Sequence, residues 1–227
     1  MKLSIVIPVY NEERTIASIL VKISGLDLKK EIIVINDGSS DRTAEILSTL
    51  SQRLPLKILN HKINQGKGAA IKTGVRQAVG DYVIIQDADL EYDPSQIVKL
   101  IQEAEKTNSP VVYGSRFSGQ VKKMPWSSRI ANLFLTFLTN ILFGSQLTDM
   151  ETCYKLFKRK VIQAIDWQAR GFDFEPEITA RILKKGIKIR EVAISYTARS
   201  VKEGKKINWK DGIKAIKLLF HLRFLTK

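Results

Sequence analysis

Residues 82–89 read Tyr82-Val83-Ile84-Ile85-Gln86-Asp87-Ala88-Asp89, an apolar run that ends in two carboxylates one residue apart. The run is too short for a helix, and apolar residues bounded by polar ones are typical of a strand covered on both faces. We therefore expect a buried strand with Asp87 and Asp89 at its carboxyl end. In open α/β sheets, ligands bind at that edge.

Two acids in a low dielectric require a cation, a base or a shared proton. A divalent metal that carries a diphosphate meets this need, because Mg²⁺ or Mn²⁺ takes one or two carboxylates together with phosphate oxygens and water. Glu91 and Asp93 follow closely and add acidic character. The sequence favours a metal and nucleotide site here. The alternative is a solvated acidic turn that caps the helix beginning near Pro94.

The same alternation of apolar strands and amphipathic helices extends over the first half of the chain. We expect strands at residues 3–9, 32–35, 56–59, 82–85 and 111–113, with helical periodicity between them. Strand, helix, strand at this spacing predicts an α/β fold, a mostly parallel sheet with helices on both faces.

Charged side chains follow these strands where each one ends. The residues concerned are Glu12, Asp37, Asp87, Asp89 and Arg116. Parallel strands bring such ends to one edge of the sheet, so these side chains should converge on a single cleft.

The glycine-containing segment 64–68, Asn-Gln-Gly-Lys-Gly, opens the helix after the third strand. It could cradle phosphate at the helix start, but it lacks the spacing of a P-loop. A flexible turn with an exposed Lys67 is the alternative. No Gly-x-Gly-x-x-Gly follows the first strand, so nothing indicates a dinucleotide fold.

The formal charge of +14 is unevenly spread. Residues 1–116 carry 15 Lys and Arg against 14 Asp and Glu, whereas residues 117–227 carry 22 against 9. The basic half indicates an anionic partner: nucleic acid, a phosphate-rich substrate or a membrane surface. Nucleic-acid binding would predict basic residues interleaved with aromatic ones along a groove. Here the basic residues border apolar helices, which favours a membrane and no nucleic acid.

Residues 130–143 are nearly all apolar except for a narrow polar stripe at helical spacing, Asn132, Thr136, Thr139 and Asn140. The stretch is too short to span a bilayer. A buried core helix is one interpretation; an interfacial helix is preferred, because basic residues and a tryptophan precede it. The last helix, 208–224, is a basic amphipathic helix with Trp209, Ile213, Ile216 and Phe220 on one face.

Three further segments carry charged residues. Asp149 lies beside the strand-like run 153–157, where it could be a general base or part of a structural turn. The acids of segment 171–177 open a helix and are explained by the helix dipole. A basic loop after the strand at 192–196 contains Arg199 and Lys205 and could close on phosphate.

Length and composition predict one globular domain, 1–227. One cysteine, Cys153, excludes an internal disulfide framework and a zinc cluster. Met1-Lys2 runs directly into a strand pattern, so we expect no signal peptide and a cytoplasmic location. No run reaches spanning length, so we expect any membrane contact to be peripheral.

Five motifs, in order, carry a resemblance. They are Pro8-Val9-Tyr10-Asn11-Glu12, Asn36-Asp37-Gly38-Ser39, Asn64-Gln65-Gly66-Lys67-Gly68, Asp87-Ala88-Asp89 and Gly114-Ser115-Arg116-Phe117. Together they resemble glycosyltransferase family 2, and within it the polyprenyl-phosphate (dolichyl-phosphate) mannosyl- and glucosyltransferases. The resemblance is strong over residues 1–117 and weaker to about Trp209.

The resemblance implies a GT-A fold with a nucleotide-sugar-binding half, 1–117, and an acceptor- and membrane-facing half, 118–227, that holds amphipathic interface helices. By similarity the nucleotide-sugar is held by Pro8, Tyr10, Glu12, Asp37, Lys67, Asp87, Ala88, Asp89, Glu91 and Arg116. Within this set, the Asp37 carboxylate would accept a hydrogen bond from the base. The metal, Mg²⁺ or Mn²⁺, would lie near Asp87, Asp89 and Glu91, with Asp89 as its most direct ligand. The implied catalytic residues are Asp89, Arg116, Asp149, Arg199 and Lys205. Glu91 stands where mannosyl members often have Gln, so mannose and glucose both remain open.

The expected function is inverting, metal-dependent transfer of a hexose from a GDP- or UDP-hexose to a polyprenyl or dolichyl phosphate at the cytoplasmic face of a membrane. One alternative is a family 2 transferase with a saccharide or protein acceptor. A more distant one is a basic nucleic-acid-binding module with a regulatory nucleotide cleft.

Overall fold

The computed structural model describes residues 1–199 and 209–225. Its strands are β1 Leu3–Val9, β2 Lys30–Asn36, β3 Leu56–Asn60, β4 Tyr82–Ile85, β5 Val111–Lys122, β6 Lys155–Lys158 and β7 Arg190–Thr197. They form one seven-stranded sheet in the order β3-β2-β1-β4-β6-β5-β7. The α/β fold expected from the sequence is confirmed.

The sheet is mostly parallel, with one exception. β6 lies between β4 and β5 and runs antiparallel to both. The sequence pattern alone would have paired β4 with β5, because nothing local in a four-residue strand indicates its direction. The consequence for the site is that the loop before β6 enters the sheet edge beside the ends of β4 and β5.

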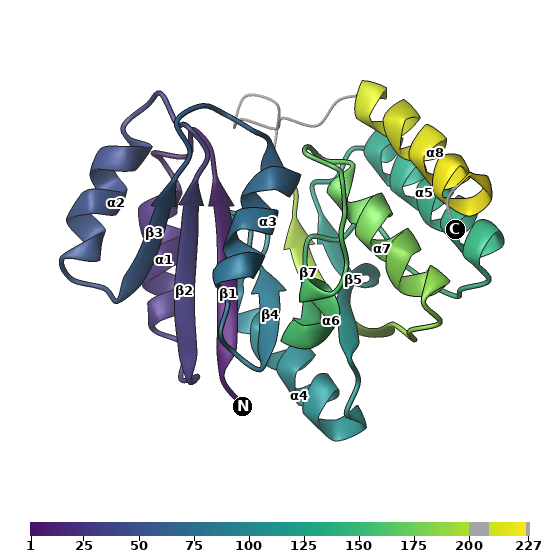
Figure 1. Ribbon diagram of the computed structural model, residues 1–227, viewed down its shortest axis with the longest axis horizontal. Coiled ribbons are helices and arrows are strands. Elements are labelled where there is room, and N and C mark those ends of the chain that lie inside the picture. The colour runs from purple at the N-terminus through teal and green to yellow at the C-terminus, as the bar shows by residue number, and fades with distance from the viewer. Residues whose placement is uncertain (200–208, 226–227) are drawn as a thin grey trace.

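The helices are α1 Ile16–Ser24, α2 Thr43–Ser51, α3 Lys67–Gln77, α4 Ile97–Thr107, α5 Trp126–Phe143, α6 Arg159–Gln163, α7 Phe174–Lys184 and α8 Trp209–Phe224, with a 3-10 turn, η1 Pro94–Gln96. Helices α3 and α6 cover the front of the sheet in Figure 1, and α1 lies behind it. This arrangement buries the apolar strands, and Ile5, Ile33 and Ile84 are fully inaccessible to solvent.

A second, smaller apolar cluster lies beyond the sheet, where α8 packs on α5 and α7 at the right of Figure 1. α8 contributes Ala215, Leu219 and Leu222 to it. Within the described ranges, no helix is both long and apolar enough to cross a bilayer.

Helix α5 has apolar side chains on both its inner and its outer face. Its inner face carries Leu135 and Leu142 together with part of the polar stripe: Thr136 and Thr139 are 3% and 0% exposed, and the Met150 amide donates to Thr136 Oγ1 at 3.0 Å. Its outer face carries further large apolar side chains, namely Trp126, Ile130, Leu133, Phe134, Phe137 and Ile141. Because burial of apolar area stabilises a fold, an exposed surface of this size indicates an apolar partner. The polar stripe was predicted, and its burial was not.

Candidate functional site

One cavity of about 900 Å³ runs along the carboxyl edge of the sheet. Ten residues expected to bind a nucleotide-sugar line it: Pro8, Tyr10, Glu12, Asp37, Lys67, Asp87, Ala88, Asp89, Glu91 and Arg116. Arg199, which follows β7, lines it too. The expectation that the strand ends converge on a single cleft is therefore confirmed. The individual binding roles stay predictions.

Lys67 is the cation of a buried ion-pair chain. Its Nζ lies 2.9 Å from Asp87 Oδ1 and 2.8 Å from Glu175 Oε1. Burial alone would lower the pKa of Lys67, but the two carboxylates raise that pKa well above its usual value. Burial would likewise raise the pKa of Asp87, and Lys67 lowers it below its usual value. The alternative of an exposed lysine in a flexible turn is wrong.

Three carboxylates near the carboxyl end of β4 lie around the guanidinium of Arg199. Arg199 Nη2 lies 2.7 Å from Asp89 Oδ2, and Arg199 Nη1 lies 3.0 Å from Glu12 Oε2. The backbone amide of Arg199 donates to Glu91 at 2.6 Å, and Tyr196 donates to the same carboxylate at 2.9 Å. Burial, reinforced by Asp87 and Glu91, raises the pKa of Asp89 to about 7. Asp89, Glu12 and Glu91 therefore lie together around Arg199.

The resemblance implies that the Asp37 carboxylate binds the nucleotide base. In this structure the same carboxylate bonds to backbone amides and to His61. It is 2% exposed, accepts from the amides of Gln65 and Gly66 at 3.0 and 2.8 Å, and pairs with His61 Nδ1 at 2.6 Å. Asp37 therefore holds the glycine segment at the start of α3. Gly66 has φ +96°, and a Cβ there would lie 2.3 Å from the Arg170 carbonyl oxygen, so only glycine fits. The base contact stays a prediction.

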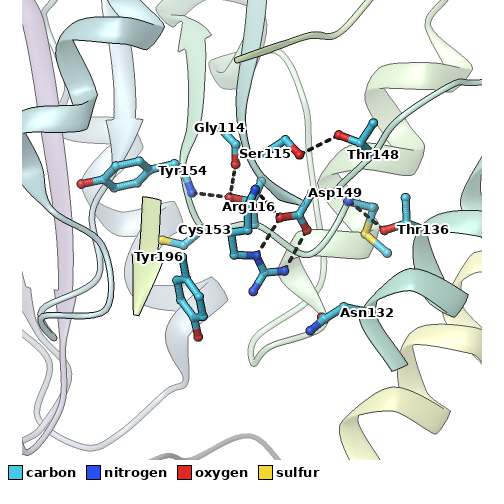
Figure 2. Close-up of polar contacts among 12 residues, drawn as sticks. Gly114, Ser115, Arg116, Asn132, Thr136, Thr148, Asp149, Cys153, Tyr154 and Tyr196 are labelled. Atoms are coloured by element: carbon cyan, nitrogen blue, oxygen red, sulfur yellow. Dashed lines mark hydrogen bonds and ion pairs between the residues drawn. The ribbon is translucent and has the colours of Figure 1, made fainter. Parts of the chain in front are cut away.

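Arg116 and Asp149 form a buried ion pair with two side-chain bonds of 2.7 and 2.8 Å (Figure 2). The Arg116 amide adds a third at 2.9 Å, and the guanidinium lies 5.2 Å from the centre of the Tyr196 ring. Asp149 is 0% exposed and does not line the cavity, whereas Arg116 does. The structure therefore gives Asp149 the task of positioning Arg116. Figure 2 also shows Asn132 projecting from α5 toward this pair.

Two cavity-lining acids escaped the sequence analysis. Glu151 comes from the loop before β6, and its Oε1 is buried without a hydrogen-bond partner among the described residues. Burial, with a further contribution from Glu175, raises the pKa of Glu151 to about 7. The second is Glu175, 4% exposed and paired with Lys67. For Glu151, the available signal was a second acid two residues after Asp149, in a stretch that could equally be a turn.

The acids Glu175 and Glu177 lie in the first turn of α7, as the helix-dipole explanation expects, but the dipole alone does not account for their contacts. Glu175 points into the cavity to Lys67. Glu177 accepts from the amides of Gln168 and Ala169, at 3.0 and 2.6 Å, and pairs with Arg181. Both side chains are buried, and their partners lie at the start of α3, in the segment just before α7 and within α7 itself, so specific contacts add to any effect of the helix end.

The far end of the cavity is lined by α5 and α8. Small or polar residues there include Ser127, Ala131, Asn132, Gly212 and Ala215. Leu135 and Ile213 add apolar surface. A charged strand-end part and a mostly apolar helix end therefore share one continuous space.

Two predictions remain outside this geometry. Lys205 lies outside the described residues. For the metal, no three His, Cys, Asp or Glu side chains within residues 1–199 and 209–225 are grouped so as to hold an ion. Asp87, Asp89 and Glu91 as joint ligands therefore stay a prediction, and a metal here would depend on phosphate oxygens for much of its coordination.

Comparison with known proteins gives relatives across most of the chain. The dolichol-phosphate mannosyltransferase of Pyrococcus furiosus is 30% identical over 213 residues, covering 90% of this chain. This chain spans 59% of the length of that protein. An uncharacterised protein of Methanocaldococcus jannaschii is 29% identical over 231 residues, covering 96% of this chain and 89% of its own.

A solved structure shares the fold. Glucosyl-3-phosphoglycerate synthase from Mycobacterium tuberculosis, in complex with Mn²⁺ and UDP-glucose, matches with a TM-score of 0.75 at 19% identity. The match covers 100% of this chain and 80% of that one. Residues 4–166 match the family described as Glycosyl transferase family 2. The chain belongs to glycosyltransferase family 2.

Proposed function

We propose that the protein transfers a single hexose from a nucleotide-sugar to a polyprenyl phosphate, with inversion, while bound to the cytoplasmic face of a membrane. The observation that carries the proposal is the continuous cavity. It joins the charged strand ends to a space between α5 and α8, two helices with large apolar side chains on their outer surfaces. A lipid phosphate has these two properties in one molecule.

The donor occupies the strand-end part of the cavity. Its nucleoside lies against Pro8 and Tyr10, and its diphosphate lies near Asp89. The Pyrococcus relative and the Mn²⁺ and UDP-glucose complex of the mycobacterial enzyme support a donor of this class. GDP and UDP, and mannose and glucose, are the candidates.

The chemistry of the carboxylates fits a divalent metal. Hard oxygen ligands suit Mg²⁺ or Mn²⁺, and Asp87, Asp89 and Glu91 all line the cavity at the end of β4. Asp89 is the proposed direct ligand, with Asp87 and Glu91 nearby. When bound, the ion supplies charge neutralisation for the diphosphate leaving group.

The transfer step is an in-line displacement. An oxygen of the acceptor phosphate forms a bond to the anomeric carbon, the bond from that carbon to the diphosphate oxygen breaks, and the nucleoside diphosphate leaves with the electron pair. Arg116 and Arg199 line the cavity and stabilise the departing charge. Lys205 is proposed to assist, as the resemblance implies.

A phosphate acceptor is favoured over a sugar or protein hydroxyl by the state of Asp149. A hydroxyl acceptor needs a general base, but the Asp149 carboxylate is buried and bonded to Arg116. A phosphate monoester is already anionic near neutral pH, with a second pKa of about 6. Its attack requires positioning rather than deprotonation.

The test is product formation. The protein is incubated with UDP- and GDP-hexoses, Mn²⁺ and a polyprenyl phosphate in detergent, and lipid extracts are analysed by mass spectrometry. One nucleotide-hexose should yield a polyprenyl-phosphate hexose, and EDTA should abolish the product. Transfer to free saccharides or peptides but not to the lipid phosphate would overturn the proposal.

The membrane part is tested with vesicles. Phe137 and Ile141 are 61% and 63% exposed on α5, and exposed lysines such as Lys214 and Lys217 lie on α8. Basic residues near an anionic surface contribute about 1 kcal/mol each. Binding to anionic vesicles should be strong and salt-sensitive, and a Phe137→Ser/Ile141→Ser variant should bind less. Val21→Ser, an exposed apolar residue on α1, is the control. Equal recovery of all three in the supernatant would contradict peripheral binding.

A further inference from the structure

Glu151 lines the cavity, and its carboxylate oxygen Oε1 is buried without a hydrogen-bond partner among the described residues. A buried polar atom without a partner costs about 1–3 kcal/mol, so such atoms are rare unless a ligand or water satisfies them. None of the described residues does so for Glu151 Oε1. The oxygen is therefore available to a group bound in the cavity.

The carboxylate of a second glutamate, Glu175, lies near that of Glu151. Glu175 is 4% exposed, lines the same cavity and is fixed by Lys67 at 2.8 Å. Lys67 in turn reaches Asp87 at 2.9 Å, next to the diphosphate position. The polar surface thus continues directly from the phosphate end to the two glutamates. Cys153 and Phe172 complete this part of the lining.

The charge state of this pair suits hydroxyl groups. Burial raises the pKa of Glu151 to about 7, so near neutral pH it is a carboxylic acid in a large fraction of molecules and can both donate and accept. Glu175, paired with Lys67, accepts only. Two adjacent hydroxyl groups on a sugar ring are complementary to this pair, because one can donate to Glu175 and the other can donate to or accept from Glu151.

We propose that Glu151 and Glu175, with Lys67, form the subsite that holds the hexosyl ring of the donor, and that this subsite selects a neutral hexose over a hexuronate. A hexuronate would bring a further carboxylate beside Glu151 and Glu175, and Lys67, the cation that pairs with Glu175, already pairs with Asp87 as well. The inference rests on the proposed function for the position of the donor diphosphate. It does not depend on the acceptor.

The experiment measures dissociation constants by calorimetry in the presence of Mn²⁺. The ligands are UDP and GDP, UDP-glucose and GDP-mannose, and the matching hexuronates, UDP-glucuronate and GDP-mannuronate. The ratio of the constant for the nucleoside diphosphate to that for its hexose isolates the contribution of the sugar. The proteins are the parent, Glu151→Ala, Glu151→Gln and Glu105→Gln, the last an exposed acid on α4 that serves as the control.

Glu151→Ala should weaken binding of the nucleotide-hexose by about tenfold while leaving the nucleoside diphosphate unchanged, because one hydrogen-bonding group is lost from the sugar contact alone. Glu151→Gln keeps a donor and an acceptor and should restore most of the affinity. The parent should bind the hexuronate at least about tenfold more weakly than the hexose. The control should match the parent throughout.

Three results would overturn the inference. Equal effects of Glu151→Ala on nucleoside diphosphate and nucleotide-hexose would place the residue outside the sugar contact. Equal affinity of the parent for the hexose and the matching hexuronate would show that the subsite does not select a neutral sugar. Absence of any nucleotide binding by the parent would overturn both this inference and the proposed function. Tight donor binding without lipid product would contradict only the proposed function.

Discussion

At the strand-end part of the cavity, acidic side chains are largely buried and paired with Lys67 or Arg199, whereas on α5 and α8 several large apolar side chains face outward. Each arrangement would be costly in an ordinary soluble domain. Buried charge is tolerated when it is paired, and exposed apolar area when a partner covers it. The two parts therefore indicate two different missing partners, a charged one and an apolar one.

The largest effect is expected from replacing Asp89, the acid closest to the guanidinium of Arg199. Asp89→Asn should lower hexose transfer by at least about 100-fold, the scale expected when one electrostatic stabiliser of a transition state is lost. Initial rates with donor and lipid phosphate measure this. Asp93→Asn, the same change outside the cavity lining, is the control. Turnover of Asp89→Asn within tenfold of the parent, with an intact fold, would contradict the metal and diphosphate role.

Arg199 is tested next. Arg199→Ala should cost about 2–4 kcal/mol in kcat/KM, because its guanidinium meets phosphate charge in a site largely shielded from water. Lys205→Ala should have a similar effect and Lys202→Ala a far smaller one. Steady-state kinetics with donor varied would show this. If the three variants behave alike, these basic residues act only as a general positive charge.

The third prediction uses pH to examine the unpartnered acid. The pKa of Glu151 is about 7 in the fold against an ordinary value of 4.5. The folded protein therefore holds this proton more tightly, and the associated stability, present below about pH 4.5, is lost as pH rises to about 7. Relative to Glu151→Gln, the parent should lose up to about 3 kcal/mol between these values. Urea unfolding at several pH values measures the difference. A pH-independent difference would mean that Glu151 titrates normally.

The smallest effect separates the two faces of α5. Thr136→Val leaves the Met150 amide without its acceptor and should lower the free energy of unfolding by about 1–3 kcal/mol. Phe137→Ser, one residue along the same helix, replaces an exposed side chain and should change stability by less than about 0.5 kcal/mol. Thermal and urea unfolding of both variants provide the data. The reverse ranking would mean that the apolar face is the packed one.

The sequence could predict the strand ends because each rule used was local. An apolar run followed by polar residues marks a parallel strand and its edge, so Asp37 and Asp89 were placed correctly on the cavity. Arg116 also lines the cavity, but the expected strand end at residue 113 is wrong, because β5 continues through Arg116 to Lys122. The direction of a strand and its neighbours in the sheet do not follow from the local sequence. The antiparallel insertion of β6, and with it the approach of Glu151 to Glu175, depends on contacts between segments far apart in the chain.

Helical periodicity also has a defined limit. It located the polar stripe of α5, but a period does not say which face is buried, and Thr136 and Thr139 turned out to face inward. On α8 the same limit applies. Ile213 and Phe220 are exposed as expected, whereas Ile216 packs against the cluster formed with α5 and α7.

The most direct test of the whole account is the separation of donor and acceptor affinities in one variant. Phe137→Ser/Ile141→Ser changes only the exposed face of α5, so the KM for a vesicle-borne polyprenyl phosphate should rise by about tenfold or more, while the KM for the nucleotide-hexose stays the same. The account predicts this split. Equal changes in both constants, or an unchanged acceptor KM, would contradict the assignment of one charged donor end and one apolar acceptor end to the same cavity.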